Sequence, residues 1–276
     1  MRDTVRHLMA SQTSILFVGD VVARTGRRAL RELLPGLREE HALDFVVVNG
    51  ENASGGIGIT PKHADELFAA GVDVITLGNH TYRHREVWPY LDEQRNILRP
   101  ANFLRTQPGH GTTVFERDGK SLGVVNLSGN LYMQAGSPAL VTIDEALQEV
   151  ERADHVLVDM HAEATSEKVA LGWLLDGRVA AVVGTHTHVP TADARVLPGG
   201  TAYITDVGMT GARGGVIGMK KEQSIAVMRT QMPMRYEPSE VDPWLMGVHI
   251  ETDGRKATAI TQVLRPAGTS PSGRTS

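Results

Sequence analysis

The sequence predicts an α/β fold in one domain, with an antiparallel contribution near the C-terminus. Short apolar runs rich in β-branched residues recur along the chain, which is typical of strands buried on both faces. Helical patterns separate the earlier runs, and this alternation indicates βαβ units. A chain of 276 residues with a hydrophobic fraction of 41% is long enough to bury the core of such a domain.

The first half of the chain alternates between the two kinds of element. Residues 27–40 carry leucines at positions 30, 33, 34 and 37, which is the stripe of a helix with one buried face. Thr60 followed by Pro61 indicates the start of a second helix, and residues 86–94 form a weaker third. The expected strands are residues 15–18, 45–48, 72–77, 122–125, 156–158 and 179–183.

The second half of the chain has a different pattern. Residues 201–206, 245–251 and 257–264 are predicted to be strands. The last two flank the four residues 252–255, whose Asp-Gly pair is typical of a hairpin turn. This hairpin is the antiparallel contribution to the predicted fold.

Composition limits the remaining possibilities. The chain has no cysteine, which excludes disulfides, thiol nucleophiles, iron–sulfur clusters and cysteine-type zinc sites. The net charge of -4 argues against a strongly basic nucleic-acid surface. No apolar run approaches the ~18 residues of a membrane span. We therefore expect a cytoplasmic protein with neither a DNA nor a membrane partner, while binding of RNA ends and a homo-oligomer stay open.

The ends of the chain differ in composition from the rest. Residues 1–14 lack the apolar core of a signal peptide, and we expect them to form a flexible extension. Residues 15–265 are predicted to form a single domain. Residues 266–276 are rich in Pro, Gly, Ser and Thr, which predicts a disordered tail.

Polar side chains that can hold metal ions follow five of the predicted strands. Ligands of open α/β sheets bind beyond the carboxyl ends of the strands, so we expect these side chains to converge on one rim. Carboxylate, amide and imidazole groups without sulfur suit Mn, Fe, Zn or Co. Seven candidate ligands are too many for one ion, which indicates two ions sharing a bridging carboxylate. The seven are Asp20, Glu51, Asn52, Asn79, His161, His186 and His188.

Each of these residues also has a plain structural interpretation. Asp20 could cap a helix, Asn79 belongs to an ordinary Gly-Asn turn pair, and His161 could be a satisfied core histidine. His186 and His188 are the strongest local signal, because residues i and i+2 of an extended chain point to the same side. The recurrence of ligand types at five strand ends favours the metal site.

Three further residues are weaker candidates for contact with substrate. Gly56 and Gly58 lie in a glycine-rich loop before a predicted helix, where backbone amides could bind phosphate. A simple flexible turn explains the same loop equally well. Arg213 lies between glycines and could reach a substrate.

The motifs as a set point to one family. The stretches GDVVARTGRRAL, VNGENASGGIGIT, TLGNH, GTHTHVPTAD and DVGMTG together resemble the YmdB-like branch of the calcineurin-like metallophosphoesterases, over residues 15–263. That superfamily usually carries Asp-x-His after the first strand and Asp after the second. This chain has Asp20-Val21-Val22 and Glu51 there, and both departures are similar to the YmdB-like branch.

The resemblance implies a four-layer α/β/β/α sandwich, a di-metal centre and hydrolysis of cyclic nucleotides. Fe or Mn is the expected metal, with Zn, Co or Mg open. A hydroxide between the ions would attack a 2′,3′-cyclic nucleotide, and 3′,5′-cyclic nucleotides are an open second substrate. By this resemblance, Asp20, Glu51, Asn52 and His188 would hold one ion and Glu51, Asn79, His161 and His186 the other, with Glu51 bridging.

His80 is the predicted general acid. It directly follows the candidate ligand Asn79, so its imidazole can lie beside the metals without being a ligand. A ribose alkoxide is a poor leaving group unless it is protonated, and a histidine suits that task.

Two other functions stay open at this stage. One is a phosphomonoesterase or nucleotidase that uses the same centre. The other is a regulator that holds a nucleotide or RNA end through the metals without turnover. The intact ligand set and His80 favour catalysis, because a binding module has no need of a general acid.

Overall fold

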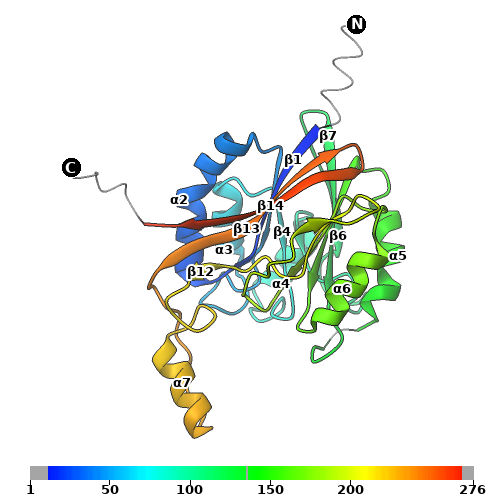
Figure 1. Cartoon of the computed structure of the whole chain (residues 1–276). Helices are drawn as coiled ribbons and strands as arrows, with labels where there is room; N and C mark the ends of the chain where they lie inside the picture. The colour runs from blue at the N-terminus through cyan, green and yellow to red at the C-terminus, as the bar shows by residue number, and fades with distance from the viewer. Residues whose placement is uncertain (1–11, 135, 269–276) are drawn as a thin grey trace, which may run out of the picture.

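The computed structural model describes residues 12–134 and 136–268, which fold around two β-sheets (Figure 1). The first sheet contains β1 (Gln12–Val18), β2 (Asp20–Val21), β3 (Phe45–Asn49), β4 (Val74–Thr76), β5 (Ile97–Leu98), β12 (Met209–Ala212), β13 (Pro243–Asp253) and β14 (Lys256–Pro266). The second contains β6 (Thr112–Arg117), β7 (Lys120–Ser128), β8 (His155–His161), β9 (Ala181–Thr185), β10 (Arg195–Val196) and β11 (Ala202–Ile204).

Both sheets are mixed. In the first sheet β1, β3, β4 and β5 are parallel neighbours, while β13 runs antiparallel to β1, β12 and β14. In the second sheet β7, β8, β9 and β11 are parallel, and β6 and β10 are antiparallel edge strands. The predicted α/β class with an antiparallel contribution near the C-terminus is therefore confirmed.

The described helices are α2 (Ala23–His41), α3 (Pro61–Ala69), α4 (Val87–Glu93), α5 (Ala139–Glu149), α6 (Thr165–Leu174) and α7 (Lys221–Thr230). Figure 1 shows α2 and α3 on one side of the strands and α5 and α6 on the other. In α2 the predicted leucine stripe faces inward, with Leu30, Leu34 and Leu37 buried. Thr60 caps α3 as predicted, since its side chain accepts a hydrogen bond from the backbone N–H of His63.

Three buried hydrophobic clusters hold these elements together. Side chains alternate along β1, as strand geometry requires: Leu16 joins the cluster with α2 and α3, and Phe17 joins the cluster between the two sheets. A third cluster joins α5 and α6 to the second sheet, and includes Ile143 and Leu171. The cluster between the sheets fixes the strands of one sheet against those of the other, and this sets the position of their carboxyl ends.

Several element boundaries differ from the prediction. β1 begins at Gln12 rather than Ile15, because it pairs with β13 from Gln12 onward. β14 continues to Pro266, and the hairpin between β13 and β14 turns at Gly254 and Arg255 as predicted. Residues 1–11 and 269–276, which carry most of the expected extension and tail, lie outside the described residues.

The sequence patterns did not predict α5, α6 and α7, or the short strands β2, β5, β6, β10 and β12.

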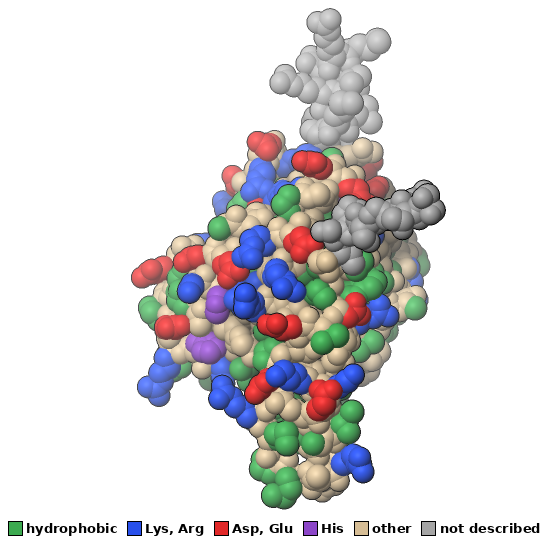
Figure 2. Space-filling view, turned by 90° about the vertical axis from the view of Figure 1, so that its left-hand side faces the viewer, with side chains coloured by type: hydrophobic (Ala, Val, Ile, Leu, Met, Phe, Trp, Pro, Cys, Tyr) green, Lys and Arg blue, Asp and Glu red, His purple; other side chains and the backbone are tan. Residues whose placement is uncertain are grey.

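Helix α7 projects from the body in Figure 1, and of its residues only Ser224 is buried. Figure 2 shows hydrophobic side chains on this projection. Met228, which lies in α7, is 71% exposed. Among the described residues, no helix combines the length and the hydropathy that crossing a bilayer would need.

Candidate metal centre

The seven predicted ligands lie close together, at the carboxyl ends of strands from both sheets. Glu51 and Asn79 follow β3 and β4 of the first sheet, and Asp20 opens β2 beside them. His161 is the last residue of β8, and His186 follows β9, both in the second sheet. The carboxyl ends of these strands meet as predicted. They belong, however, to two sheets packed face to face, and not to the rim of a single sheet.

The tightest part of the cluster surrounds the Nε2 atom of His161. Nε2 lies 3.0 Å from Glu51 Oε1, 3.2 Å from Asn79 Oδ1 and 3.0 Å from His186 Nδ1. Glu51, His161 and His186 each offer one ligand atom within 4.8 Å of the others. Three or four ligand atoms converging this closely is the arrangement that a transition-metal ion requires.

The second part of the cluster contains Asp20, Asn52 and His188. His188 Nε2 lies 3.6 Å from Asp20 Oδ1 and 3.2 Å from Asn52 Nδ2. Asp20 Oδ1 is buried and has no hydrogen-bond partner among the described residues, whereas Oδ2 accepts the backbone N–H of His186 at 3.1 Å. A buried carboxylate oxygen without a partner is costly, which makes Oδ1 available to a cation.

Asn52 is the one predicted ligand whose oxygen faces away from the others. Its Oδ1 accepts a hydrogen bond from His80 Nδ1 at 2.9 Å, and its Nδ2 faces Glu51 and His188. Ligation through the amide oxygen would require a half-turn of the amide group, since only the oxygen can bind a metal.

The charges in the centre depend on one another. Burial opposes ionisation, yet the nearby histidines lower the pKa of Glu51 well below its usual range and also lower that of Asp20. Burial also opposes a charge on His161, but Glu51 and Asp20 raise the pKa of its imidazole to about 9. Burial and the positive charge of His161 lower the pKa of His186 to about 4. The carboxylates therefore remain ionised and attract positive charge into this site.

Hydrogen bonds behind His161 fix which of its nitrogens faces the centre. Thr185 Oγ1 donates to Asp159 Oδ1 at 2.7 Å and lies 2.9 Å from His161 Nδ1. Because its single proton goes to Asp159, the hydroxyl accepts from Nδ1, and Nδ1 carries the proton. Nε2 is then the nitrogen that would bind a metal once its own proton is displaced, which is the orientation that such outer contacts impose on metal-binding histidines.

Asp159 itself is fully buried, and burial raises the pKa of its carboxyl group to about 6. It also accepts hydrogen bonds from Thr76 Oγ1 at 2.5 Å and Asn49 Nδ2 at 3.1 Å. Thr76 and Asn49 belong to the first sheet and Asp159 to the second. This network therefore links the two sheets directly behind the centre.

The loop that carries His186 and His188 has its own support. Asp206 Oδ2 accepts from Thr187 Oγ1 at 2.6 Å and from the buried ammonium group of Lys168 at 2.9 Å. His186 and His188 adopt φ values of 95° and 66°, in the left-handed region that side chains disfavour. These contacts hold the loop in that conformation.

Two further contacts complete the surroundings of the centre. Glu163 Oε2 lies 3.1 Å from His186 Nε2, on the ring edge opposite the atom that faces His161. Gly78 leaves the room that the ligands occupy, since a Cβ atom there would lie 2.2 Å from both Glu51 Oε2 and His161 Cδ2. Glycine is required at this close approach for steric reasons.

His80 lies at the edge of the centre, as predicted, with a side chain 32% exposed. Its Nδ1 donates to Asn52 Oδ1, because an amide oxygen can only accept, and it lies 3.4 Å from Glu51 Oε1. The second ring nitrogen remains for contact with a ligand, and His80 lines a cavity of about 330 Å³ together with His188.

The weaker candidates have different positions. Gly56 lines the same cavity as His80, and its φ of 90° is one that glycine adopts readily. A Cβ atom on Gly58 would meet Arg83 and His84 at 2.7 Å, so this glycine serves local packing. Arg213 is exposed and its guanidinium lies 4.7 Å from the ring centroid of Trp244.

Sequence reasoning missed the supporting residues Asp159, Thr185, Glu163 and Asp206. A signal existed for Asp159, because an acid two residues before His161 in an apolar strand faces the same side and needs a partner. Glu163 continues the same spacing beyond His161. No sequence spacing relates Asp206 to the loop that it supports.

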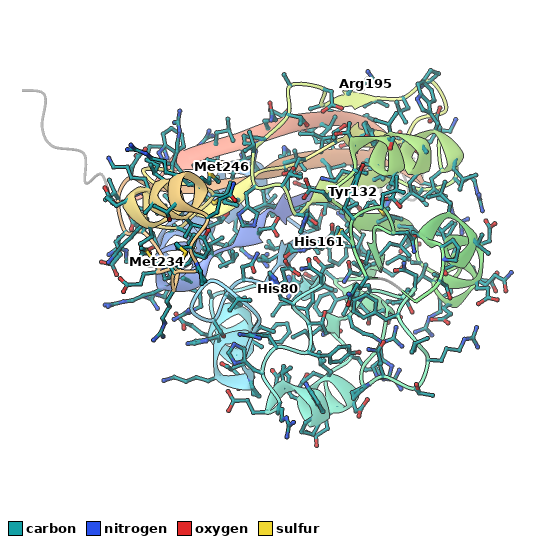
Figure 3. The ribbon with its side chains drawn as sticks, turned by 90° about the horizontal axis from the view of Figure 1, so that it is seen from below. His80, Tyr132, His161, Arg195, Met234 and Met246 are labelled. Atoms are coloured by element: carbon teal, nitrogen blue, oxygen red, sulfur yellow. The ribbon has the colours of Figure 1, made fainter. Side chains whose placement is uncertain are left out.

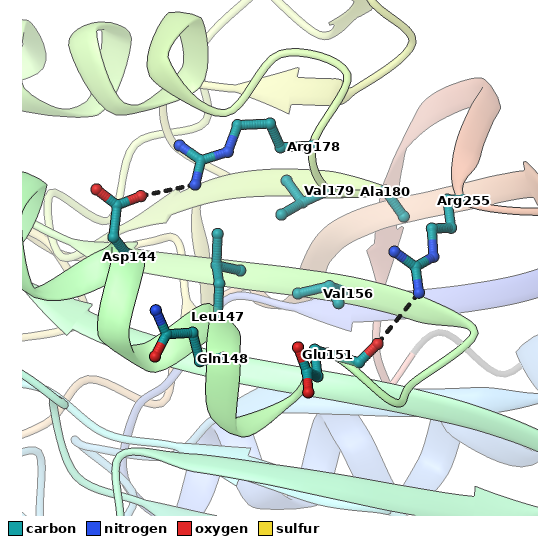
Figure 4. A pocket seen from close by; sticks show the side chains of 9 residues that line it. All are labelled: Asp144, Leu147, Gln148, Glu151, Val156, Arg178, Val179, Ala180 and Arg255. Carbon is teal, nitrogen blue, oxygen red and sulfur yellow. Dashed lines mark hydrogen bonds and ion pairs between the residues drawn. The ribbon is translucent and has the colours of Figure 1, made fainter.

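A separate cavity of about 330 Å³ lies at α5, between Asp144 and Arg255 (Figure 4). Its two arginines are engaged with the protein: Arg178 pairs with Asp144 at 2.6 Å, and Arg255 donates to the backbone oxygen of Glu151 at 3.1 Å. Val156, near the start of β8, lines this cavity, whereas His161 ends the same strand. The cavity therefore lies at the amino ends of the strands of the second sheet, and the metal-ligand cluster lies at their carboxyl ends.

The fold is shared with solved structures of much lower sequence identity. A candidate 5′-nucleotidase from Staphylococcus aureus superposes with a TM-score of 0.62, covering 94% of this chain and 55% of that chain at 16% identity. At this identity the likeness is one of fold alone.

The family follows from closer relatives. A sequence profile of the family described as YmdB-like protein matches residues 16–263, and the chain belongs to this family. A relative from Bacillus subtilis (strain 168) is 46% identical over 253 residues, covering 91% of this chain and 96% of the relative, and is named 2′,3′-cyclic-nucleotide 2′-phosphodiesterase. A structure from Thermus thermophilus has a TM-score of 0.87 at 41% identity, covering 92% of this chain and 99% of that chain. The expected membership of the YmdB-like family is confirmed.

Proposed function

We propose that the protein is a metal-dependent hydrolase that opens 2′,3′-cyclic nucleotides at the 2′ oxygen. The observation that carries this proposal is the convergence of carboxylate, amide and imidazole ligand atoms around His161 Nε2. The name of the B. subtilis relative supports the choice of substrate. The three hydrophobic clusters also support the four-layer α/β/β/α arrangement.

The donor set fits a pair of metal ions. His161 Nε2 faces acceptor oxygens of Glu51 and Asn79, which favour positive charge on the imidazole, and a bound cation would supply that charge in place of the proton. Asp20 Oδ1 offers a buried oxygen with no partner among the described residues. The first ion would be held by Asp20, Glu51, Asn52 and His188, and the second by Glu51, Asn79, His161 and His186.

Two divalent ions, when bound, supply an acidified water nucleophile and positive charge for the phosphoryl oxygens, and Fe or Mn suits these ligands best. The residues of the chain hold the site in place. Glu51 contacts both groups of ligands, since its Oε1 lies near His161 and near Asn52. Thr185 and Asp159 keep the His161 proton on Nδ1, and Glu163 orients the ring of His186.

His80 would protonate the leaving 2′ oxygen. Its Nδ1 stays bonded to Asn52 Oδ1, so the proton would be delivered from Nε2. The product is a nucleoside 3′-phosphate.

The test compares metal-reconstituted protein on 2′,3′-cyclic nucleotides, 3′,5′-cyclic nucleotides and nucleoside monophosphates. We expect turnover of the first group, and turnover of monophosphates alone would establish a phosphomonoesterase instead. His80→Ala should lower kcat about 10²–10⁴-fold on 2′,3′-cyclic AMP and much less on bis(p-nitrophenyl) phosphate, whose leaving group needs no proton. Equal losses on the two substrates would contradict the role of His80 as an acid.

A further inference from the structure

A pocket of about 610 Å³, which is within the usual size range of small-molecule sites, lies beside the metal-ligand cluster. Asn79 and His186, two of the candidate metal ligands, line one part of it. The other lining residues are Tyr82, Phe103, Leu104, Gln107, Tyr132, Met133, Gln134 and Gly136. The pocket is therefore continuous with the place where the phosphate would be bound.

The position of the pocket in the fold is consistent with a ligand site. Tyr82 follows β4, Phe103 follows β5, and Tyr132 follows β7, so all three lie on loops beyond carboxyl ends of parallel strands. This is where ligands bind in α/β sheets. In Figure 3 the labels of Tyr132, His161 and His80 fall in the central part of the view from below.

The lining combines aromatic side chains with uncharged polar ones, among them the amides of Gln107 and Gln134. Tyr82 and Phe103 lie with ring centroids 6.1 Å apart and are tilted by 36°, and Tyr82 is fixed by donating to the backbone oxygen of Pro108 at 2.7 Å. None of the lining residues is Asp, Glu, Lys or Arg. The pocket therefore offers no lysine or arginine to bind a second phosphate, whereas a flat uncharged ring could stack on its aromatic side chains.

Tyr132 has the features of a stacking surface. Its side chain is 92% exposed, and its backbone has φ of 63°, which is disfavoured for a bulky residue. The neighbouring backbone is held in place, since Glu167 accepts from the N–H groups of Asn130 at 2.8 Å and Leu131 at 3.1 Å. A fixed backbone leaves only the two side-chain torsions of Tyr132 to be ordered when a partner binds, which limits the cost in conformational entropy.

We propose that this pocket is the nucleoside subsite, in which the base of a mononucleotide stacks on Tyr132 while its phosphate lies at the metal-ligand cluster. The inference rests on the proposed function and deepens it. The uncharged lining favours a mononucleotide over an RNA end, whose further phosphates would lie against it. Because every base has an aromatic face, stacking gives affinity with little selection among bases.

The experiment separates the base from the phosphate. KM is measured for 2′,3′-cyclic AMP and for methyl riboside 2,3-cyclic phosphate, which lacks the base, with wild type, Tyr132→Ala and Tyr132→Phe. Stacking predicts that Tyr132→Ala raises KM for cyclic AMP about 5- to 150-fold, with little change for the analogue. Tyr132→Phe should remain close to wild type. Trp173→Ala, which removes a 53% exposed aromatic outside the pocket, is the matched control.

The outcomes distinguish the two proposals. Equal effects of Tyr132→Ala on both substrates, or no effect on either, would overturn the subsite. If wild type hydrolyses neither cyclic substrate, the proposed function fails, and binding decides the subsite separately. Calorimetric titration should then give weaker binding of adenosine 3′-phosphate to Tyr132→Ala than to wild type, with no such difference for ribose 3-phosphate. An unchanged affinity for adenosine 3′-phosphate would overturn the subsite.

Discussion

Gly78→Ala should abolish tight metal binding while leaving the fold in place. The added Cβ would lie 2.2 Å from Glu51 Oε2 and from His161 Cδ2, whereas ordinary contacts begin at 3.4 Å. The difference, 3.4 minus 2.2, means that each group must move by about 1.2 Å. Metal-ligand distances tolerate only about 0.2 Å, so both ligands would leave their positions.

The size of the effect follows from the packing. Glu51 and His161 have almost no exposed surface, and His161 is tied to Thr185 at 2.9 Å, so neither can move freely. Overpacking of this kind costs about 1–3 kcal/mol of unfolding free energy. Because two ligands are displaced together, we expect metal affinity to fall at least ~100-fold, beyond the effect of losing one supporting contact.

The assay is calorimetric titration of metal-free protein with Mn²⁺, together with thermal unfolding. Gly36→Ala is the matched control: a Cβ there meets nothing within 4 Å, and alanine suits the interior of α2. It should bind metal as wild type does and unfold at an equal or slightly higher temperature. Wild-type metal affinity in Gly78→Ala would refute the reasoning, since it would mean that Glu51 and His161 are not ligands or can move freely.

Three further predictions concern the ligands, their support and a buried histidine. His188→Ala should lose bound metal, whereas His80→Ala should retain it by elemental analysis, and equal losses would make His80 a ligand. Thr185→Val should weaken metal binding about 10- to 100-fold in calorimetry, because the proton on His161 Nδ1 loses its acceptor, and unchanged affinity would dismiss this role. Burial lowers the pKa of His155 below its usual 6.5, so the unfolded chain takes up the proton first and stability falls as pH drops below 6.5. In thermal unfolding, His155→Gln should therefore lose less stability than wild type as the pH drops. A pH profile identical to that of wild type would contradict this role of His155.

The sequence by itself determined the fold class and which candidate ligands the structure brings together. Strands buried on both faces are rich in β-branched residues, and helices with one buried face carry a stripe of apolar residues. The strands β1, β3, β4, β8 and β9 could therefore be predicted from local patterns. The seven candidate ligands could be predicted because they follow buried runs, where a polar side chain has few structural uses. Helix α6 was missed, because its pattern lies between two strands without a start signal such as Thr60-Pro61.

Only the tertiary structure decided how these parts meet. Local sequence patterns are the same whether five strands share one sheet or two, and the choice depends on packing between the sheets, in which Phe17 and Leu157 take part. The support of His161 by Thr185 and Asp159, and of the histidine loop by Asp206, joins residues whose spacing along the chain carries no signal. The pocket at Tyr132 likewise requires three loops to be brought together. Sequence specifies which side chains are available at strand ends, and long-range packing determines which of them face one another.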